Sequence, residues 1–441
     1  MPHASPPDEL VIRNGRVLDP ASGRDETADV LIRNGRVEAI APALDAGAAK
    51  TLDAGGCLVA PGLVDPHVHL REPGGEAKET IATGTRAAVA GGFTTVCCMP
   101  NTTPTLDSVS ALEFVHGRAT ESAACRVFVV AAATIGRQGE QIAPIDSLIG
   151  AGAVGISDDG DVVASPRMMR QVLACCAQHD AVFMQHAQEP SLTEGASMNS
   201  GLTASKLGLR GWPKIAEELI VERDIRLLGE TGGRYHVQHV SSGTTVELIR
   251  NARKAGLEVS GEASPHHLLL DDRACDGYDT MAKMNPPLRS EADIHALRQG
   301  VADGTITVLA TDHAPHTLEE KALDFESAPF GIVGLECALA LYAKALIDTS
   351  LIDWPRLIAL LSIEPARLVG LENEGIGRLD VGLPADITII DPEREWTIDT
   401  SAFVGKGRNC PFEGWPVKGR AVGTLIEGSP VHAEDSILSS H

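Results

Sequence analysis

The chain has 441 residues, with 60 acidic and 37 basic side chains and a formal net charge of −23. This acidity disfavours nucleic acid as a partner, because a phosphate backbone repels an acidic surface. Apolar residues make up 43% of the chain, enough for a large core, which excludes a disordered protein. No apolar run approaches the roughly 18 residues that span a bilayer, so we expect no integral membrane protein.

The start of the chain and its cysteines indicate a cellular compartment. The first ten residues, MPHASPPDEL, lack the basic stretch followed by an apolar stretch that a secretory signal requires. The nine cysteines are odd in number, have no CxxC spacing and include two adjacent pairs inside apolar stretches. Such cysteines are typical of reduced, buried thiols. We therefore expect a cytoplasmic protein.

The first sixty residues have the pattern of strands and turns. The hexapeptide IRNGRV occurs twice, beginning at Ile12 and at Ile32, and each copy contains an Asn-Gly turn signal. The repeat is too short to indicate a solenoid. We expect two similar hairpins in one small sheet.

From about Leu58 the pattern changes to apolar strand-like runs that alternate with helical segments such as 215–228 and 245–255. This alternation is typical of βαβ units on a parallel sheet. The expected strands end near Val68, Met99, Ala133, Ser157, Met184, Gln238, Ser260 and Ala310. Eight such alternations predict a (β/α)8 TIM barrel of the α/β class.

After Gly370 the strand-and-turn pattern returns, in residues 377–398 and 419–431. This similarity to the first sixty residues predicts that the two ends of the chain pair with each other. We expect a small discontinuous β-sandwich domain built from residues 1–58 and 373–441. The barrel would then occupy residues 59–372.

Residues able to bind a metal gather where the expected strands end, which is where barrels of this kind build their active sites. His67 and His69 lie two residues apart on one strand and so point to the same side. Alone, this HxH pair is a weak signal, since two half-exposed polar positions look the same. His186, His239 and Asp312 follow three other strands. Imidazoles and carboxylates suit Zn²⁺, and we expect one or two zinc ions per chain, with two favoured.

Motifs along nearly the whole chain carry a family resemblance. PGLVDPHVHLREPG, DHAPH and GLPADITIID resemble the cyclic-amide hydrolases of the amidohydrolase superfamily. HLREPG, CMPNT, SDDG, GLTASKLGLRGWP, MNPPLR and PFGIVGLE are similar to motifs of the long bacterial (class I) dihydroorotases. The resemblance implies a zinc-dependent enzyme that interconverts (S)-dihydroorotate plus water and N-carbamoyl-L-aspartate in de novo pyrimidine (UMP) biosynthesis.

The resemblance also implies how the metal ligands are shared. One zinc would be held by His67, His69 and Asp312 and the other by His186 and His239. A carboxylate of the SDDG motif would bridge the two ions.

Only the family resemblance indicates which carboxylate would form that bridge. Many hydantoinases, dihydropyrimidinases and allantoinases bridge their metals through a carboxylated lysine, but no lysine lies between Lys78 and Lys206 here. The motif region offers Asp158, Asp159 and Asp161, between which spacing alone does not decide. Alignment with the family motif favours Asp159.

The remaining roles concern catalysis and substrate binding. Asp312 is expected to act first as a base toward water and then as an acid toward the leaving ring nitrogen. Arg71, two residues beyond His69, suits a substrate carboxylate, although alone it reads equally as a surface residue. The substrate-binding set implied by the family is His69, Arg71, Asn101, Asn285, His316, Phe330 and Gly331. Residues 318–334 are expected to form a loop that could close over the substrate.

Two alternative functions stay open. A hydantoinase or allantoinase acting on another cyclic ureide would use the same chemistry, but the absent lysine and the HLREPG motif argue against it. A catalytically silent scaffold that partners aspartate carbamoyltransferase is the other alternative. Such copies typically lose metal ligands, whereas this sequence retains them. A homodimer and a complex with aspartate carbamoyltransferase are both compatible with the sequence.

Overall fold

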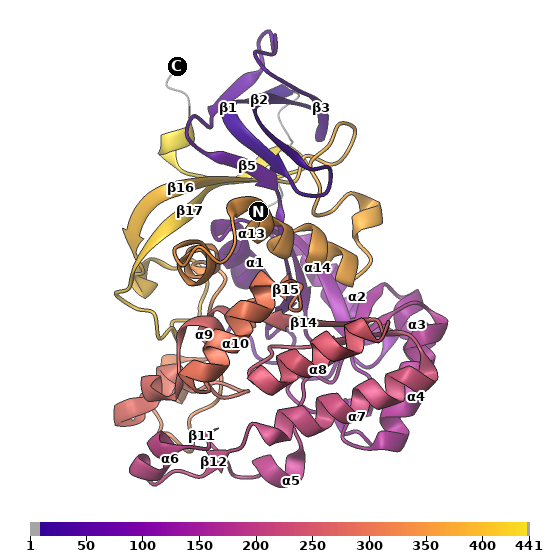
Figure 1. The fold of residues 1–441 in the computed structure, drawn as a ribbon. Helices are drawn as coiled ribbons and strands as arrows, with labels where there is room; N and C mark the ends of the chain where they lie inside the picture. The colour runs from indigo at the N-terminus through magenta and orange to yellow at the C-terminus, as the bar shows by residue number, and fades with distance from the viewer. Residues whose placement is uncertain (1–8, 439–441) are drawn as a thin grey trace.

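The computed structural model describes residues 9–438 and contains two large sheets of eight strands each (Figure 1). Residues 1–8, on which the expectation about a secretory signal mainly depends, lie outside the described residues. Within residues 9–438, no helix is both long enough and apolar enough to cross a membrane. The cytoplasmic location stays a prediction from the sequence.

The first large sheet is the expected barrel. Its strands are all parallel and follow the order β15-β14-β13-β10-β9-β8-β7-β6. The strands are β6 (Leu63–Val68), β7 (Phe93–Cys98), β8 (Arg126–Ala131), β9 (Ala153–Ile156), β10 (Val182–Gln185), β13 (Arg234–Val237), β14 (Val259–Ala263) and β15 (Val308–Leu309). A parallel bridge between Val68 and His313 brings the two ends of this order together. All eight predicted strands are confirmed, and with them the (β/α)8 barrel.

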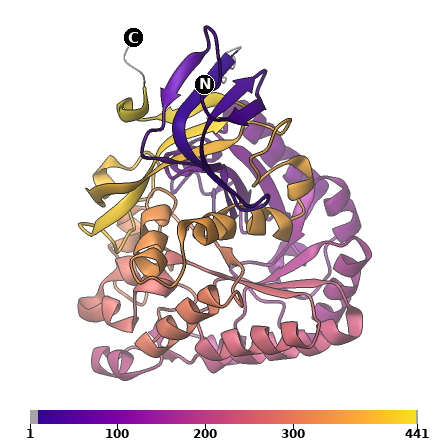
Figure 2. The same cartoon turned by 45° about the horizontal axis from the view of Figure 1, so that its top comes forward.

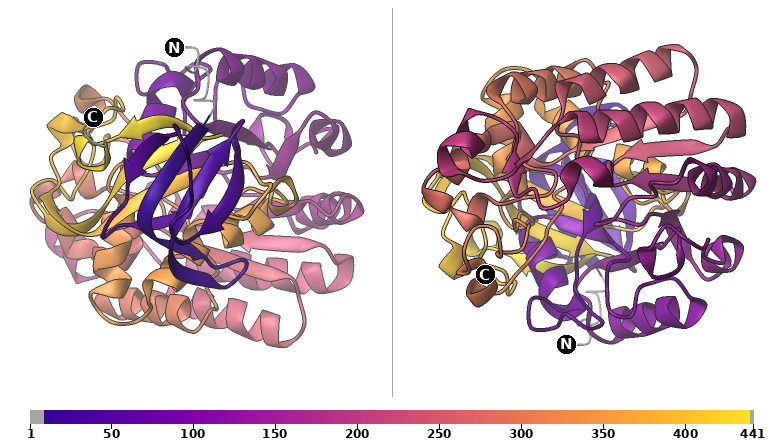
Figure 3. Two further views of the ribbon diagram at one scale, coloured as in Figure 1. Left: turned by 90° about the horizontal axis from the view of Figure 1, so that it is seen from above. Right: turned by 90° about the horizontal axis from the view of Figure 1, so that it is seen from below.

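Helices lie outside the strands, as the views from the side and from below show (Figures 1 and 3). They are α1 (Ile81–Ala90), α2 (Val109–Ser122), α3 (Ile145–Gly150), α4 (Pro166–Gln178), α7 (Ile215–Thr231), α8 (Gly243–Lys254), α10 (Glu291–Ala302), α12 (Ala338–Tyr342), α13 (Trp354–Leu361) and α14 (Ile363–Leu368). The predicted helices 215–228 and 245–255 correspond to α7 and α8. Several helices begin at a side chain that caps free backbone N–H groups, such as Thr80 before α1 and Ser290 before α10.

Short elements occupy the long loops after the barrel strands. They are α5 (Pro190–Thr193), α6 (Leu202–Leu207), α9 (Pro265–Leu269), α11 (Leu318–Lys321) and a two-stranded parallel sheet of β11 (Met198–Asn199) and β12 (Gly211–Trp212). Figure 1 shows α5, α6, β11 and β12 at the end of the molecule far from the second large sheet. These loops provide part of the wall of the cavity described below.

The second large sheet combines both ends of the described chain. Its strands are β1 (Glu9–Asp19), β2 (Arg24–Arg33), β3 (Arg36–Ala41), β4 (Lys50–Asp53), β5 (Leu58–Pro61), β16 (Ile387–Thr397), β17 (Pro416–Ile426) and β18 (Ser429–Ala433). The order is β18-β17-β16-β5-β1-β2-β3, and β4 also pairs with β1. β5 and β16 pair antiparallel, so the indigo and yellow strands of Figures 2 and 3 share one hydrogen-bonded sheet. The discontinuous β unit is confirmed, while its predicted boundaries stay a prediction.

The repeated hexapeptide adopts two different structures. The second copy forms the predicted turn, between β2 and β3, where Asn34 and Gly35 have φ values of 49° and 76°. The first copy instead lies inside β1 at a shift of register between Ile12 and Gly15. Asn14 has a φ of 62° there, and its backbone N–H donates to Asp29 Oδ1 over 3.1 Å. The expected turn at the first copy is therefore wrong, because β1 pairs with neighbours along its whole length and only bulges.

Candidate active site

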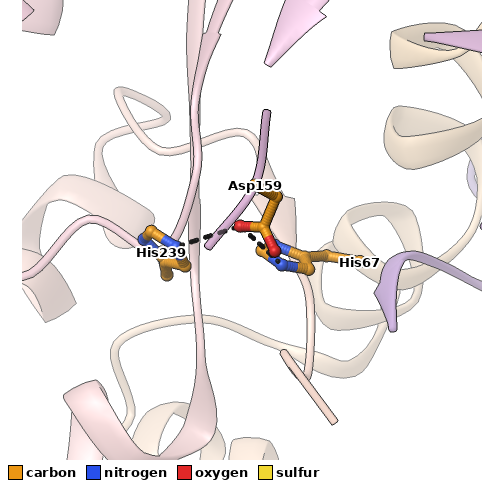
Figure 4. A group of neighbouring side chains, drawn as sticks. All are labelled: His67, Asp159 and His239. Atoms are coloured by element: carbon orange, nitrogen blue, oxygen red, sulfur yellow. Dashed lines mark ion pairs between the residues drawn. The ribbon is translucent and has the colours of Figure 1, made fainter. Parts of the chain in front are cut away.

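Five predicted metal ligands and the favoured bridge lie at the carboxyl ends of the barrel strands. His67 is the penultimate residue of β6, and His69 follows that strand directly. Asp159, His186, His239 and Asp312 follow β9, β10, β13 and β15 within three residues. All six side chains are buried. Figure 4 shows His67 and His239 facing the Asp159 carboxylate from two sides.

The Asp159 carboxylate lies at the centre of the group. Its Oδ1 is 3.3 Å from His67 Nε2, 3.4 Å from His186 Nδ1 and 3.6 Å from His239 Nε2. Its Oδ2 is 3.5 Å from His69 Nε2. One carboxylate thus faces four imidazole rings, a set of donors that suits a divalent metal.

The other two acids of the SDDG region are occupied elsewhere. Asp158 accepts hydrogen bonds from the backbone N–H groups of Ala133 and Thr134 over 2.8 and 3.0 Å, and also from the Thr134 hydroxyl. Asp161 is exposed and pairs with Arg137 over 3.0 Å. Of these three carboxylates, only that of Asp159 lies among the histidines, while its role as a bridge stays a prediction.

The group fits a divalent metal. Two sets of three residues have ligand atoms within 4.8 Å of one another, His67 with Asp159 and His239, and His67 with His69 and Asp312. His67 Nε2 and Asp159 Oδ1 are buried and form no hydrogen bond. His186 Nδ1 and His239 Nε2 lie only 2.8 Å apart. Buried polar atoms left unpaired are costly, and a cation shared by these atoms would remove that cost.

The far nitrogen of three rings is held by an acceptor. His67 Nδ1 lies 2.5 Å from Glu262 Oε1, and His69 Nδ1 lies 2.9 Å from Asn101 Oδ1. His186 Nε2 lies 3.1 Å from Gln188 Oε1. An acceptor beside the far nitrogen favours the tautomer that carries its proton there, and in that tautomer the near nitrogen is free to bind a cation.

Glu262 is the main residue that the sequence analysis missed. Besides His67, it accepts from His236 Nε2 over 3.0 Å and from the His239 backbone N–H over 3.1 Å. Burial would raise the pKa of Glu262, but the interactions with His67 and His236 outweigh it and hold the pKa well below the usual value. The available signal was a charged residue inside the buried strand β14.

Backbone strain marks the same region. Arg71, His239 and Asp312 have φ values of 60°, 32° and 48°, a region that residues with a side chain rarely adopt. Such conformations cost on the order of 1–3 kcal/mol each and persist only where the surroundings impose them. All three residues line the same cavity, so the strain lies at the candidate site, which supports a functional role.

A cavity of about 310 Å³ opens beside Asp159 and the histidines that surround it. All seven residues predicted to bind substrate line it, namely His69, Arg71, Asn101, Asn285, His316, Phe330 and Gly331. His186, His239, Asp159 and Asp312 line the same cavity. The predicted metal ligands and the predicted substrate-binding residues therefore line the same cavity.

The cavity has one cationic wall. Burial lowers the pKa of Arg71 to about 10, which still leaves its guanidinium charged at neutral pH. Burial and the charge of Arg71 lower the pKa of His316 to about 3, so this ring is neutral. His316 Nε2 lies 2.8 Å from the Phe330 carbonyl oxygen. Asn285 donates to Gln188 over 3.2 Å, while its Oδ1 is buried without a hydrogen bond.

Comparison with known structures and families gives the class. The L-hydantoinase (dihydropyrimidinase) of Arthrobacter aurescens superimposes with a TM-score of 0.87 over 98% of this chain and 97% of that one, at 26% identity. A D-hydantoinase of Bacillus sp. AR9 gives a TM-score of 0.85 over 98% and 96% of the two chains, at 28% identity. The fold and the buried histidine–aspartate group together define a cyclic amide hydrolase.

Sequence relatives are more specific. Residues 56–245 match the family model described as "Dihydro-orotase-like". The dihydroorotase of Syntrophotalea carbinolica is 45% identical over 95% of this chain and 98% of its own length. That of Pelotomaculum thermopropionicum is 44% identical over 96% and 98% of the two chains. The chain belongs to the dihydroorotase family.

The role of Glu262 can be tested through metal retention. Glu262→Gln keeps the shape but weakens the contact that orients His67, so we expect metal affinity to fall about 10- to 100-fold. The measurement is metal content after dialysis against buffers of graded free zinc. Glu258→Gln, an exposed position just before the same strand, serves as the matched control. Equal zinc retention by the two variants would contradict the orienting role.

Proposed function

We propose that the chain catalyses the reversible hydrolysis of the ring amide of (S)-dihydroorotate to N-carbamoyl-L-aspartate, in pyrimidine biosynthesis. The observation that carries this proposal is one cavity that joins a buried histidine–aspartate group to a cationic Arg71 wall. The reaction needs both features, since its substrate carries an amide carbonyl to be attacked and a carboxylate to be held. Membership of the dihydroorotase family supports the same substrate.

Zinc is the metal we propose, with two ions per chain. His67, His69 and Asp312 would hold one ion, His186 and His239 the other, and Asp159 would bridge them. Imidazole nitrogen and carboxylate oxygen are ligands that zinc prefers. When bound, such an ion lowers the pKa of water from 15.7 to roughly 7 and so supplies a nucleophile at neutral pH.

Asp312 is the residue we propose for proton transfer. Its carboxylate lines the cavity and has Oδ1 3.0 Å from His69 Nε2. It would take a proton from the attacking water as the new C–O bond forms at the ring carbonyl. As the ring C–N bond breaks, Asp312 would return that proton to the departing nitrogen, so one carboxylate acts as base and then as acid. The φ of 48° at Asp312 supports a role that depends on its orientation.

Substrate orientation would come from the opposite wall. Arg71 can pair with the substrate carboxylate in a planar, bidentate manner, with Asn101 and His316 beside it. Asn101 holds His69 through its Oδ1, which leaves its amide N–H groups for a ligand. Asn285 and the backbone of Phe330 and Gly331 would contact the edge of the ring amide.

Assembly and domain boundaries belong to the proposal as well. The limits 1–58, 59–372 and 373–441 stay as predicted from the sequence. A homodimer and a complex with aspartate carbamoyltransferase both stay open, as the sequence left them.

The decisive experiment follows absorbance near 230 nm while zinc-loaded protein is mixed with dihydroorotate. We expect loss of the dihydroorotate signal only, with hydantoin and allantoin unchanged, and no loss after treatment with a chelator. Turnover of hydantoin or allantoin instead would identify another cyclic ureide hydrolase. Absence of any turnover despite bound zinc would favour the scaffold.

Asp312→Asn tests proton transfer. The amide cannot accept and return a proton, so we expect kcat to fall about 10²- to 10⁴-fold. Zinc content is measured in the same preparation, because Asp312 is also a proposed ligand. A near-normal kcat would refute the role of Asp312 as base and acid.

Arg71→Lys tests recognition of the carboxylate. A lysine keeps the charge but loses the planar pair of donors, so we expect KM for dihydroorotate to rise about tenfold with a smaller change in kcat. Arg170→Lys, at an exposed arginine paired with Glu230, is the matched control. An unchanged kcat/KM in Arg71→Lys would show that Arg71 does not bind the carboxylate.

A further inference from the structure

One wall of the cavity is a segment without helix or strand. Residues 325–331 follow the short helix α11, and Pro329, Phe330 and Gly331 of this segment line the cavity. Backbone carbonyls that leave water on folding need hydrogen-bond donors, and here no helix or sheet ladder supplies them. Side chains provide donors for this segment.

Two buried lysines supply these donors. Lys283 and Lys321 have only 2% and 1% of their surface exposed. Lys283 Nζ donates to the carbonyls of residues 325, 326 and 328 over 2.6, 3.0 and 2.6 Å. Lys321 Nζ donates to those of residues 329 and 331 over 3.0 and 3.1 Å. The two ammonium groups thus bind five carbonyls within the seven residues of the segment.

Further contacts join this network to the cavity. The Lys283 carbonyl accepts from the Gly331 N–H over 3.0 Å and from Lys321 Nζ over 3.4 Å. Lys283 Nζ lies 4.5 Å from the centre of the Phe330 ring, a cation–π contact. The Phe330 carbonyl faces His316. The Phe330 carbonyl and both backbone groups of Gly331 therefore have buried partners, and Phe330 and Gly331 line the cavity.

The arrangement is costly as a purely structural device. Lysines are almost never fully buried without a paired charge, and among residues 9–438 no carboxylate lies within ion-pair distance of either ammonium. Burial, together with the charge of Lys283, lowers the pKa of Lys321 to about 7. A well-packed apolar side chain would avoid this cost but would remove the lysine donors from the carbonyls of residues 325, 326, 328 and 329. The Gly331 carbonyl would keep a donor, because it also accepts from Asn409 Nδ2 over 3.0 Å.

We propose that Lys283 and Lys321 are positioning residues that hold residues 325–331 as a fixed wall of the substrate cavity. The wall presents the Phe330–Gly331 backbone to the ring amide before the substrate arrives. The loop expected to close over the substrate is, in this part, already in place. The fixed wall stands on the contacts alone, whereas its effect on dihydroorotate binding rests on the proposed function.

Hydrogen–deuterium exchange of the unmodified, zinc-loaded protein tests the wall without any substitution. Within the peptide covering residues 325–331, we expect the hydrogen-bonded amides of Ala328 and Gly331 to exchange slowly in the free protein and to gain no protection with N-carbamoyl-aspartate. Fast exchange in the free protein that slows on addition of this ligand would identify a closing loop and overturn the proposal.

Lys283→Met and Lys321→Met test the two residues directly, with Lys254→Met on the exposed end of α8 as the control. In each buried variant we expect exchange of residues 325–331 to rise about tenfold. We also expect KM for dihydroorotate to rise about tenfold, with kcat and zinc content close to those of the unmodified protein.

The outcomes separate this proposal from the proposed function. Folded Lys283→Met and Lys321→Met proteins with unchanged exchange and KM would overturn the positioning role. If the unmodified protein fails to turn over dihydroorotate, the proposed function fails, while the exchange data still decide whether the wall is fixed. If neither variant folds, the exchange of the unmodified protein decides.

Discussion

A single buried carboxylate, that of Asp159, faces four imidazole rings, and much of the barrel serves to keep those rings in place. Moving a carboxylate out of water is costly, so its oxygens need buried hydrogen-bonding or cationic partners in place of water. The histidines come from three different strands, and acceptors such as Glu262 fix the orientation of the rings from behind. Because parallel strands end on the same side of a barrel, closure alone brings these side chains to one point.

The two sides of the cavity are built on different principles. On the metal side, the functional side chains lie at the ends of barrel strands. The hydrogen bonds between these strands restrict the movement of the backbone that carries the side chains. On the opposite side, an irregular segment gains similar rigidity from the ammonium groups of Lys283 and Lys321. A preformed site avoids reorganisation when charge develops during a reaction. Both sides therefore favour a site that is ready before the substrate binds.

Sequence patterns predicted the barrel because buried parallel strands appear as short apolar runs, and polar residues directly after such runs are conspicuous. The same patterns could not separate Asp159 from Asp158, since the decision depends on Thr134, a residue on another loop. Glu262 could have been found as a lone charge inside a strand expected to be buried in the barrel. Lys321 could not, because it follows two glutamates on a short helix and resembles a surface residue until the loop above it is placed.

The pairing of β5 with β16 has a consequence for protein synthesis. Pro61 and Ile387 are register partners, so β5 lacks its neighbour on one side until the ribosome has made more than three hundred further residues. At 5–20 residues per second this interval lasts about 20 to 60 s. A strand with an open edge can recruit other chains during that time. The nascent chain thus carries an aggregation-prone edge that only its last segment covers.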